Sequence, residues 1–210
     1  MLAPLLRIAF AALGIVAITY QYADRDGDPG FSTANFFSFF TIESNILAVV
    51  ALGLSAVVRT DERSFAFEVF RGAVVLYMAI TGVVFALLLS GLQAELQTAI
   101  PWVDFVVHKL LPAVVVADWL LDPPRYRLPL RLGLVWLAFP LAYVTYALIR
   151  GSSVDWYPYP FLDVSELGYG GVLARCALLA AWMAVGAIVI VAVGNGTAAL
   201  RGGPSRPRLL

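Results

Sequence analysis

The sequence has very few of the residues that build metal and redox centres. Its 210 residues include one cysteine, Cys176, and one histidine, His108. A single cysteine can form no disulfide within the chain. The sequence also has no CxxC, no HExxH and no paired Cys/His spacing, so a zinc site built by the protein has no basis. We therefore expect no metal.

Nucleotide and nucleic-acid signals are missing as well. The chain contains no GxGxxG and no P-loop, which removes the usual basis for a nucleotide site. Its formal net charge is zero, so no strong basic field indicates a nucleic-acid partner. Too little chain lies outside the apolar segments to form a separate soluble domain. We expect no cofactor and no nucleic acid.

Long apolar runs, by contrast, dominate the chain. Hydrophobic residues make up 61% of it and the mean hydropathy is +0.85, whereas soluble domains are about 45–50% apolar. Six segments are long enough to cross a bilayer, and inside hydrocarbon a lone segment satisfies its own backbone only as a helix. The predicted spans are residues 3–22, 33–58, 66–91, 100–121, 129–150 and 169–194. The predicted fold is all-α, a bundle of six transmembrane helices over residues 1–194 with a disordered cytoplasmic tail over residues 195–210.

The first span has a second interpretation, as a cleaved signal peptide. Its basic region is only Arg7, its apolar run is long, and no small-residue cleavage site stands near residues 20–22. We therefore interpret it as a retained helix.

Charge in the loops predicts the orientation. Short loops rich in lysine and arginine stay in the cytoplasm. With six spans, one side of the membrane carries most of the arginines, whereas the other has only Arg25 and Arg150 among many acidic residues. The predicted protein is a multi-pass protein of the cell membrane with both termini in the cytoplasm. The arginines of the basic side are Arg7, Arg59, Arg63, Arg125, Arg127, Arg131, Arg201, Arg206 and Arg208.

The segment from residue 100 to 121 is apolar, yet it carries several ionisable groups. On a helix, Asp104, His108 and Asp118 share one stripe, whereas Lys109 points away from it. Ionisable groups in hydrocarbon are costly, so they face the bundle interior and indicate a functional site by default. The alternative is a buried Asp104–His108 pair that only holds helices together.

Depth in the membrane brings a hydroxyl level with this histidine. Thr41 and His108 each lie about eight residues from the outer end of their spans, about 12 Å deep at the helical rise. Equal depth does not establish contact, because the order of the helices is unknown. Other polar groups expected in this outer layer are Ser44, Asn45, Thr81, Asp104, Tyr143, Tyr146 and Arg175.

This combination of residue types allows nucleophilic catalysis. A threonine hydroxyl is a weak nucleophile that needs a base, and His108 could take its proton and return it to the leaving group. Asp104 could fix the imidazole tautomer, and Arg175 could hold an oxyanion or a carboxylate. These residue types make Thr41 and His108 candidate catalytic residues, with Asp104, Asn45 and Arg175 as candidate supporting residues. The alternative for Thr41 is a hydrogen bond to the carbonyl four residues earlier, which is common in transmembrane helices.

The outer loop, residues 151–168, is unusually aromatic. Tryptophan and tyrosine suit the headgroup level, so the loop could be an interfacial anchor; it could equally be a lid over a site in the outer half of the membrane. The residues concerned are Trp156, Tyr157, Tyr159, Pro160 and Phe161.

Three stretches resemble a known family. NFFSFFTIESN (residues 35–45), VVHKLLPAVVVADW (residues 106–119) and WYPYPFLD (residues 156–163) are similar to segments of the androgen-induced family of membrane hydrolases, and more closely to its bacterial six-span relatives. The animal members are threonine hydrolases that split fatty acid esters of hydroxy fatty acids. The resemblance implies Thr41 as nucleophile and His108 as its partner.

Some features of the chain depart from that pattern. Residues 42–45 follow the bacterial relatives, and the family motifs give no role to Asp104 or Arg175. The expected partners are a long-chain lipid or fatty acid ester substrate and the surrounding membrane lipids; the sequence leaves the oligomeric state open. The rival interpretations are a transporter or an anion- or lipid-binding protein with a buried Asp–His–Arg site, and a purely structural subunit.

Overall fold

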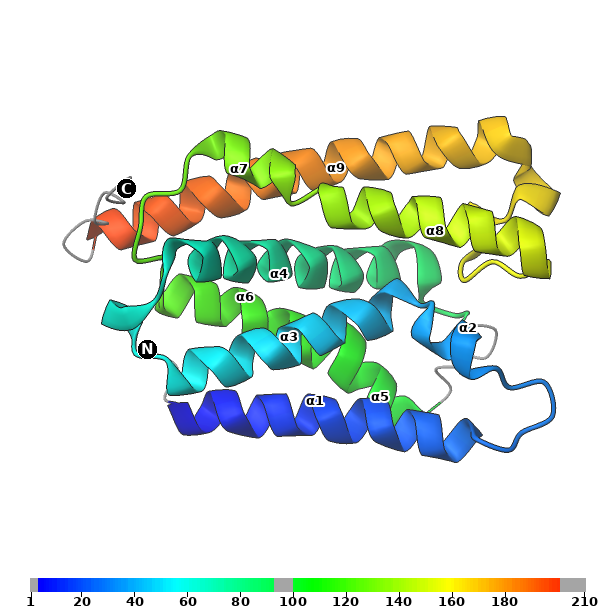
Figure 1. Ribbon diagram of the computed structural model, residues 1–210, viewed down its shortest axis with the longest axis horizontal. Coiled ribbons are helices and arrows are strands. Elements are labelled where there is room, and N and C mark those ends of the chain that lie inside the picture. The colour runs from blue at the N-terminus through cyan, green and yellow to red at the C-terminus, as the bar shows by residue number, and fades with distance from the viewer. Residues whose placement is uncertain (1–3, 93–99, 201–210) are drawn as a thin grey trace.

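The computed structural model describes residues 4–92 and 100–200, and over these residues it is helical without a strand. Figure 1 shows the longer helices running side by side along the long axis. The elements in order are α1 (Pro4–Arg25), α2 (Thr33–Phe37), α3 (Phe40–Val57), the 3₁₀ turn η1 (Thr60–Glu62), α4 (Phe65–Val84), the π-helical turn η2 (Phe85–Leu89), α5 (Pro101–Phe105), the π-helical turn η3 (Val106–Leu110), α6 (Leu111–Leu121), α7 (Leu130–Val135), α8 (Ala138–Val154), the 3₁₀ turn η4 (Pro160–Leu162) and α9 (Val164–Leu200).

Five of the described helical stretches are long and apolar enough to cross a membrane, which indicates a membrane protein. The remaining predicted span, residues 100–121, is formed by α5, η3 and α6 in succession and is not among the five. It carries Asp104, Lys109 and Asp118, so its charge sets it apart. The five are Pro4–Arg25, Phe40–Val57, Phe65–Leu89, Leu130–Val154 and Val164–Leu200.

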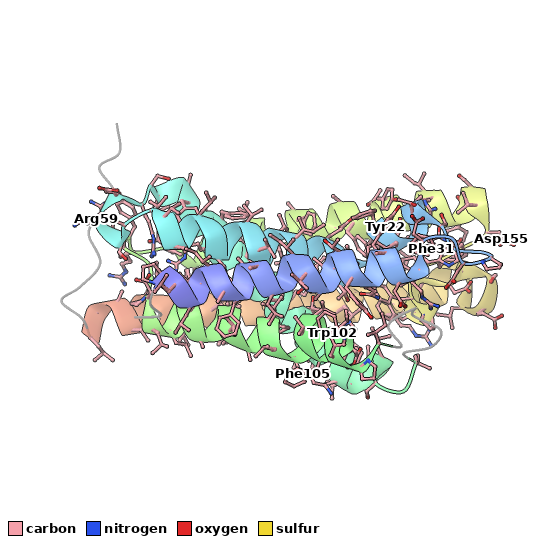
Figure 2. All side chains as sticks on the ribbon, turned by 90° about the horizontal axis from the view of Figure 1, so that it is seen from below. Tyr22, Phe31, Arg59, Trp102, Phe105 and Asp155 are labelled. Carbon is pink, nitrogen blue, oxygen red and sulfur yellow. The ribbon has the colours of Figure 1, made fainter. Side chains whose placement is uncertain are left out.

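Helix α4 lies at the centre of the bundle (Figure 1). It packs against α3 and α6 on one side and α9 on the other, and α1 covers α3. The start of α1 and the end of α9 lie at one end of the bundle, here called the basal end, with Arg59. Helix α2 and the turn from α8 to α9 lie at the opposite, distal end, where Figure 2 shows Tyr22 and Asp155.

The predicted disordered tail begins too early. Helix α9 continues through residues 195–200 to Leu200, while residues 201–210 lie outside the described part of the chain. Asn195 explains the continuation, because its side-chain amide donates to the carbonyl of Leu128 at 2.8 Å and accepts from the amide of Leu128 at 2.9 Å. The helix is thereby attached to the segment before α7.

The second predicted span, residues 33–58, is also interrupted. Helix α2 ends at Phe37 and α3 begins only at Phe40. The carbonyl of Ser38 in the break accepts a hydrogen bond from Tyr143 of α8 at 2.9 Å. This break matters for function, because it places Thr41 in the first turn of a new helix.

Close packing around two tryptophans fixes the helices near the basal half. A methyl group at Gly72 of α4 would meet the Trp136 ring at 2.4 Å, and one at Gly194 of α9 would meet the Trp119 ring at 2.7 Å. The Trp119 indole also donates to the carbonyl of Ile190 at 3.2 Å. Only glycine allows helix and ring to approach this closely.

Six charged side chains pair with one another inside the basal end. We call this group the basal charge cluster; every member is at most 4% exposed. Its residues are Arg7, Arg63, Glu68, Arg71, Asp118 and Asp122.

Salt bridges connect the basal charge cluster across four segments of the chain. Arg7 of α1 binds Asp118 at 2.8 Å and also Asp122. Arg71 of α4 binds Asp118 at 3.1 Å and Glu68 at 2.7 Å. Glu68, Arg71 and Asp118 are therefore paired inside the bundle, and Arg7, one of the arginines of the predicted basic side, is buried with them.

Asp122, which follows α6, stays ionised within this cluster. Burial by itself raises the pKa of a carboxyl group. Hydrogen bonds and charge from Arg63, Arg71 and Arg7 outweigh that effect and hold the pKa of Asp122 below its ordinary value. The carboxylate accepts from Arg63 at 2.7 Å.

Candidate functional site

Thr41, His108 and Asp104 form a continuous hydrogen-bonded array in the distal half of the bundle. The Thr41 hydroxyl oxygen lies 3.3 Å from Nε2 of His108, and Nδ1 of His108 lies 3.0 Å from a carboxylate oxygen of Asp104. The three residues are 8%, 3% and 7% exposed, so the array is shielded from solvent and lipid. With Asp104 accepting from Nδ1–H, the free lone pair of Nε2 faces the threonine hydroxyl.

Pro112 accounts for the π-helical turn that carries His108. Proline has no N–H and its ring displaces the carbonyl four residues earlier, which here belongs to His108. The helix is wider here, because the amide of Leu111 donates to the carbonyl of Val106, five residues earlier, instead of that of Val107, four residues earlier. The freed carbonyl of Val107 accepts from the side-chain amide of Asn45 at 3.1 Å. Such π turns occur often at functional sites.

Helix α4 presses against this turn and orients the imidazole. Phe85, the first residue of η2, stacks on His108 with ring centroids 3.9 Å apart and planes 10° apart. One helical turn earlier, Gly82 faces the His108 carbonyl, and a methyl group there would lie 3.3 Å from it. The ring is therefore held by a flat contact on its face and by hydrogen bonds at both nitrogens.

Thr41 is held by both its backbone and its neighbours. Its carbonyl accepts from Asn45 at 2.8 Å and from Ser44 at 3.1 Å. Its amide lies in the first turn of α3, where helical amides have no partner within the helix. Phe39, the residue before α3, provides no side-chain cap; the hydroxyl of Tyr159 accepts from the Thr41 amide instead, at 3.3 Å.

The aromatic outer loop folds inward over α3. Tyr159 is 6% exposed and packs edge-on against Phe39, with centroids 5.8 Å apart. Trp156 also packs against Phe39, with ring centroids 5.6 Å apart, and the guanidinium carbon of Arg150 lies 5.3 Å from the centroid of the Trp156 ring. Tyr157 lies against Gly151, where a methyl group would meet the ring at 2.1 Å. Tyr159 is thus packed into the bundle, whereas Trp156 and Tyr157 are half-buried.

An apolar cavity of about 120 Å³ reaches Thr41 from the side of α8 and α9. One of its lining residues, Leu141, also belongs to the outer surface of the bundle, where it is 56% exposed. Its other lining residues include Thr81, Tyr143, Tyr159, Phe161, Cys176 and Met183. A second space of about 10 Å³ is also bordered by Thr41 and contacts His108.

The structure brings together most, but not all, of the predicted site residues. Asp104 hydrogen-bonds to His108, and Asn45 donates to the carbonyls of Thr41 and Val107. Arg175 does not join them: it is exposed on α9, and its guanidinium donates to the carbonyl of Gly171 one turn away at 3.4 Å. Pro160 is exposed and opens η4. Within residues 4–92 and 100–200, no group of three His, Cys, Asp or Glu side chains could hold a metal ion.

Sequence reasoning missed three contributors to the site. It did not assign Tyr159 to the Thr41 amide, Phe85 to the face of His108, or Pro112 to the turn. The leucine–proline pair three residues after His108 was the one available signal, because a proline inside an apolar span releases a carbonyl.

Comparisons of the chain with known family models, with curated proteins and with solved structures found no match.

Proposed function

We propose that this protein is a polytopic membrane hydrolase that cleaves ester bonds of long-chain lipids. One observation carries the proposal: Thr41, His108 and Asp104 are buried and stand in hydrogen-bonding sequence, and Thr41 also lines an apolar cavity. The proposal includes a sixth membrane crossing by α5, η3 and α6, cytoplasmic termini in the cell membrane, and a place among the androgen-induced hydrolases that the sequence resembles. The start of α1 and the end of α9 both lie at the basal end, which supports an even number of crossings.

The reaction would begin at the threonine. His108 takes the hydroxyl proton on Nε2 as the Thr41 oxygen attacks the ester carbonyl. The tetrahedral intermediate expels the alkoxide, which receives that proton from His108, and an acyl group remains on Thr41. Water then attacks the acyl carbonyl with His108 again acting as base, which releases the fatty acid. Asp104 holds the imidazole tautomer and stabilises the imidazolium formed in each half.

The cavity supports an apolar substrate. At about 120 Å³ it is smaller than the pockets of about 300–1,000 Å³ that enclose a drug-sized ligand. It therefore holds only the part of an acyl chain nearest the carbonyl. The rest of the chain would pass beside Leu141 into the surrounding lipid, so the enzyme would take its substrate from the bilayer.

The test is hydrolysis of p-nitrophenyl butyrate, octanoate and palmitate by purified protein in detergent micelles. We expect turnover by the wild type and its loss in Thr41→Ala and His108→Ala. Thr145→Ala is the matched control, because Thr145 is exposed on α8 and bonds only to the Leu141 carbonyl one turn earlier among the contacts described; it should retain wild-type activity. Turnover by Thr41→Ala at the wild-type rate would refute the mechanism.

The alternative of a transporter or anion-binding protein depends on a buried Asp–His–Arg site. The exposed position of Arg175 removes the cation from that site. Asp104 and His108 remain, and their hydrogen bonds lead to the Thr41 hydroxyl, as a hydrolase requires.

A further inference from the structure

Within the described part of the chain, the hydroxyl of Tyr159 is the one side-chain group from outside α3 that is bound to the Thr41 backbone. It accepts a hydrogen bond from the Thr41 amide. A phenol has two acceptor lone pairs and one hydrogen to donate. The bond to the amide occupies a lone pair, and the Thr41 and Tyr143 hydroxyls also hydrogen-bond with this phenol. Its hydrogen can turn from these hydroxyls to a group that arrives beside Thr41.

We infer that Tyr159 is a catalytic residue that stabilises the oxyanion formed when Thr41 attacks the ester; this inference rests on the proposed hydrolase function. In that step the Thr41 oxygen bonds to the carbonyl carbon, the π pair moves to the carbonyl oxygen, and the hydroxyl proton moves to His108. The oxyanion accepts a hydrogen bond from Tyr159, which keeps its own proton. Collapse of the intermediate returns the electron pair to the carbonyl and breaks the bond to the leaving alkoxide.

The position of Tyr159 fits this role. Tyr159 and Thr41 both border the larger apolar cavity and the small space beside His108. An ester carbonyl that reached Thr41 from the cavity would therefore meet the phenol at the boundary where the base also acts. The amide of Thr41 also belongs to the first turn of α3, where the positive end of the helix dipole favours a negative charge.

The phenol is rigid and neutral, as an oxyanion donor must be. Its ring stacks on Phe161 with centroids 5.1 Å apart and planes 6° apart, and Phe39 packs against it edge-on. Burial raises the pKa of Tyr159, and the nearby Thr41 hydroxyl and amide only partly offset that rise. The group thus keeps its hydrogen at neutral pH, and the bond from the Thr41 amide makes it a stronger donor.

The rival explanation is that Tyr159 only caps α3, accepting from the amide and donating to nothing. Tyr159→Phe removes the hydroxyl and keeps the ring contacts. With p-nitrophenyl octanoate we expect kcat to fall by about 10²-fold with KM within threefold of wild type. Inhibition by an octyl trifluoromethyl ketone, which forms the tetrahedral adduct, should weaken by a similar factor. Tyr77→Phe is the matched control, since Tyr77 is a buried tyrosine that is not among the cavity's lining residues, and its hydroxyl donates to the Trp136 carbonyl at 2.8 Å; it should leave kcat unchanged.

A second variant separates donor from acceptor without removing the hydroxyl. With 3,5-difluorotyrosine at position 159, the phenol ionises at lower pH. A phenolate still accepts from the Thr41 amide but has no hydrogen to donate, so kcat should decline with rising pH earlier than in the wild type. An unshifted profile, or a Tyr159→Phe variant with wild-type kcat, would overturn the inference while Thr41→Ala still tests the hydrolase itself. A wild-type protein without esterase activity would remove both.

Discussion

Removing one partner from the basal charge cluster should destabilise the protein far more than removing a matched pair. The cluster contains three arginines and three carboxylates among the described residues, so its charges balance. Arg7→Met leaves two arginines facing three carboxylates, and Asp118→Leu leaves the reverse imbalance. Each single change strands a buried charge, and the expected cost is about 3–5 kcal/mol.

The double variant Arg7→Met/Asp118→Leu restores the balance. Arg63 still binds Asp122 at 2.7 Å and Arg71 still binds Glu68 at 2.7 Å. Apolar replacement of a whole buried pair is often neutral or favourable. We therefore expect the double variant to be more stable than either single variant, with a coupling of at least about 2 kcal/mol between the two sites.

The assay is reversible unfolding in mixed micelles by titration with sodium dodecyl sulfate, followed by far-ultraviolet circular dichroism. The four proteins of the cycle are compared at one pH and one detergent concentration. Additive losses, with the double variant as unstable as the sum of the singles, would refute the claim that the cluster acts as one balanced unit. Losses under 1 kcal/mol in both single variants would show that these charges are not buried in the folded protein.

Three further predictions follow from other parts of the structure. Gly72→Ala should lower the free energy of unfolding by about 1–3 kcal/mol, because the added methyl group overpacks against a tryptophan ring. Gly53→Ala on α3, where nothing lies within 4 Å of the added methyl group, should raise the free energy of unfolding by about 0.5–1 kcal/mol. Equal effects of the two variants in the same titration would contradict the packing. The pKa of Asp122 is depressed in the folded protein, so this carboxylate should contribute stability that is fully present above the ordinary carboxyl pKa. That contribution should be lost as pH falls through the folded-state pKa. If acidification destabilises the wild type no more than Asp122→Asn, the prediction is wrong. Pro112→Ala restores an N–H to the helix, so the turn should close and move His108 from its position. Esterase kcat should then fall by about 10²-fold, while the stability of the protein is kept or improved. An unchanged kcat would show that the π turn does not position the base.

The sequence allowed the depth of the site to be predicted but not its lateral arrangement. Counting residues from the outer ends of the spans placed Thr41 and His108 at one level, and the structure shows them in hydrogen-bond contact. The same count placed Arg175 at that level, yet it lies on the exposed surface of α9. Helix α9 is apolar on all sides, so periodicity gives no indication of which face meets the bundle.

The local breaks in the helices could not be predicted from the sequence either. The sequence predicts one span over residues 33–58, but the chain leaves the helix between α2 and α3, where the carbonyl of Ser38 accepts a hydrogen bond from α8. Tyr159 lies in a loop, and its partner Thr41 is 118 residues away in the chain. Hydrophobic periodicity gives no information about such a contact. The charge asymmetry of the loops predicts cytoplasmic termini, and that orientation stays a prediction.

The central claim is that Thr41 is a nucleophile activated by His108. Its most direct test is covalent labelling of the purified protein with a long-chain alkyl fluorophosphonate, followed by peptide mass spectrometry. We expect one adduct on Thr41, slower labelling in His108→Ala, and none in Thr41→Ala. An adduct on a different residue, or labelling of Thr41→Ala at the wild-type rate, would contradict the account.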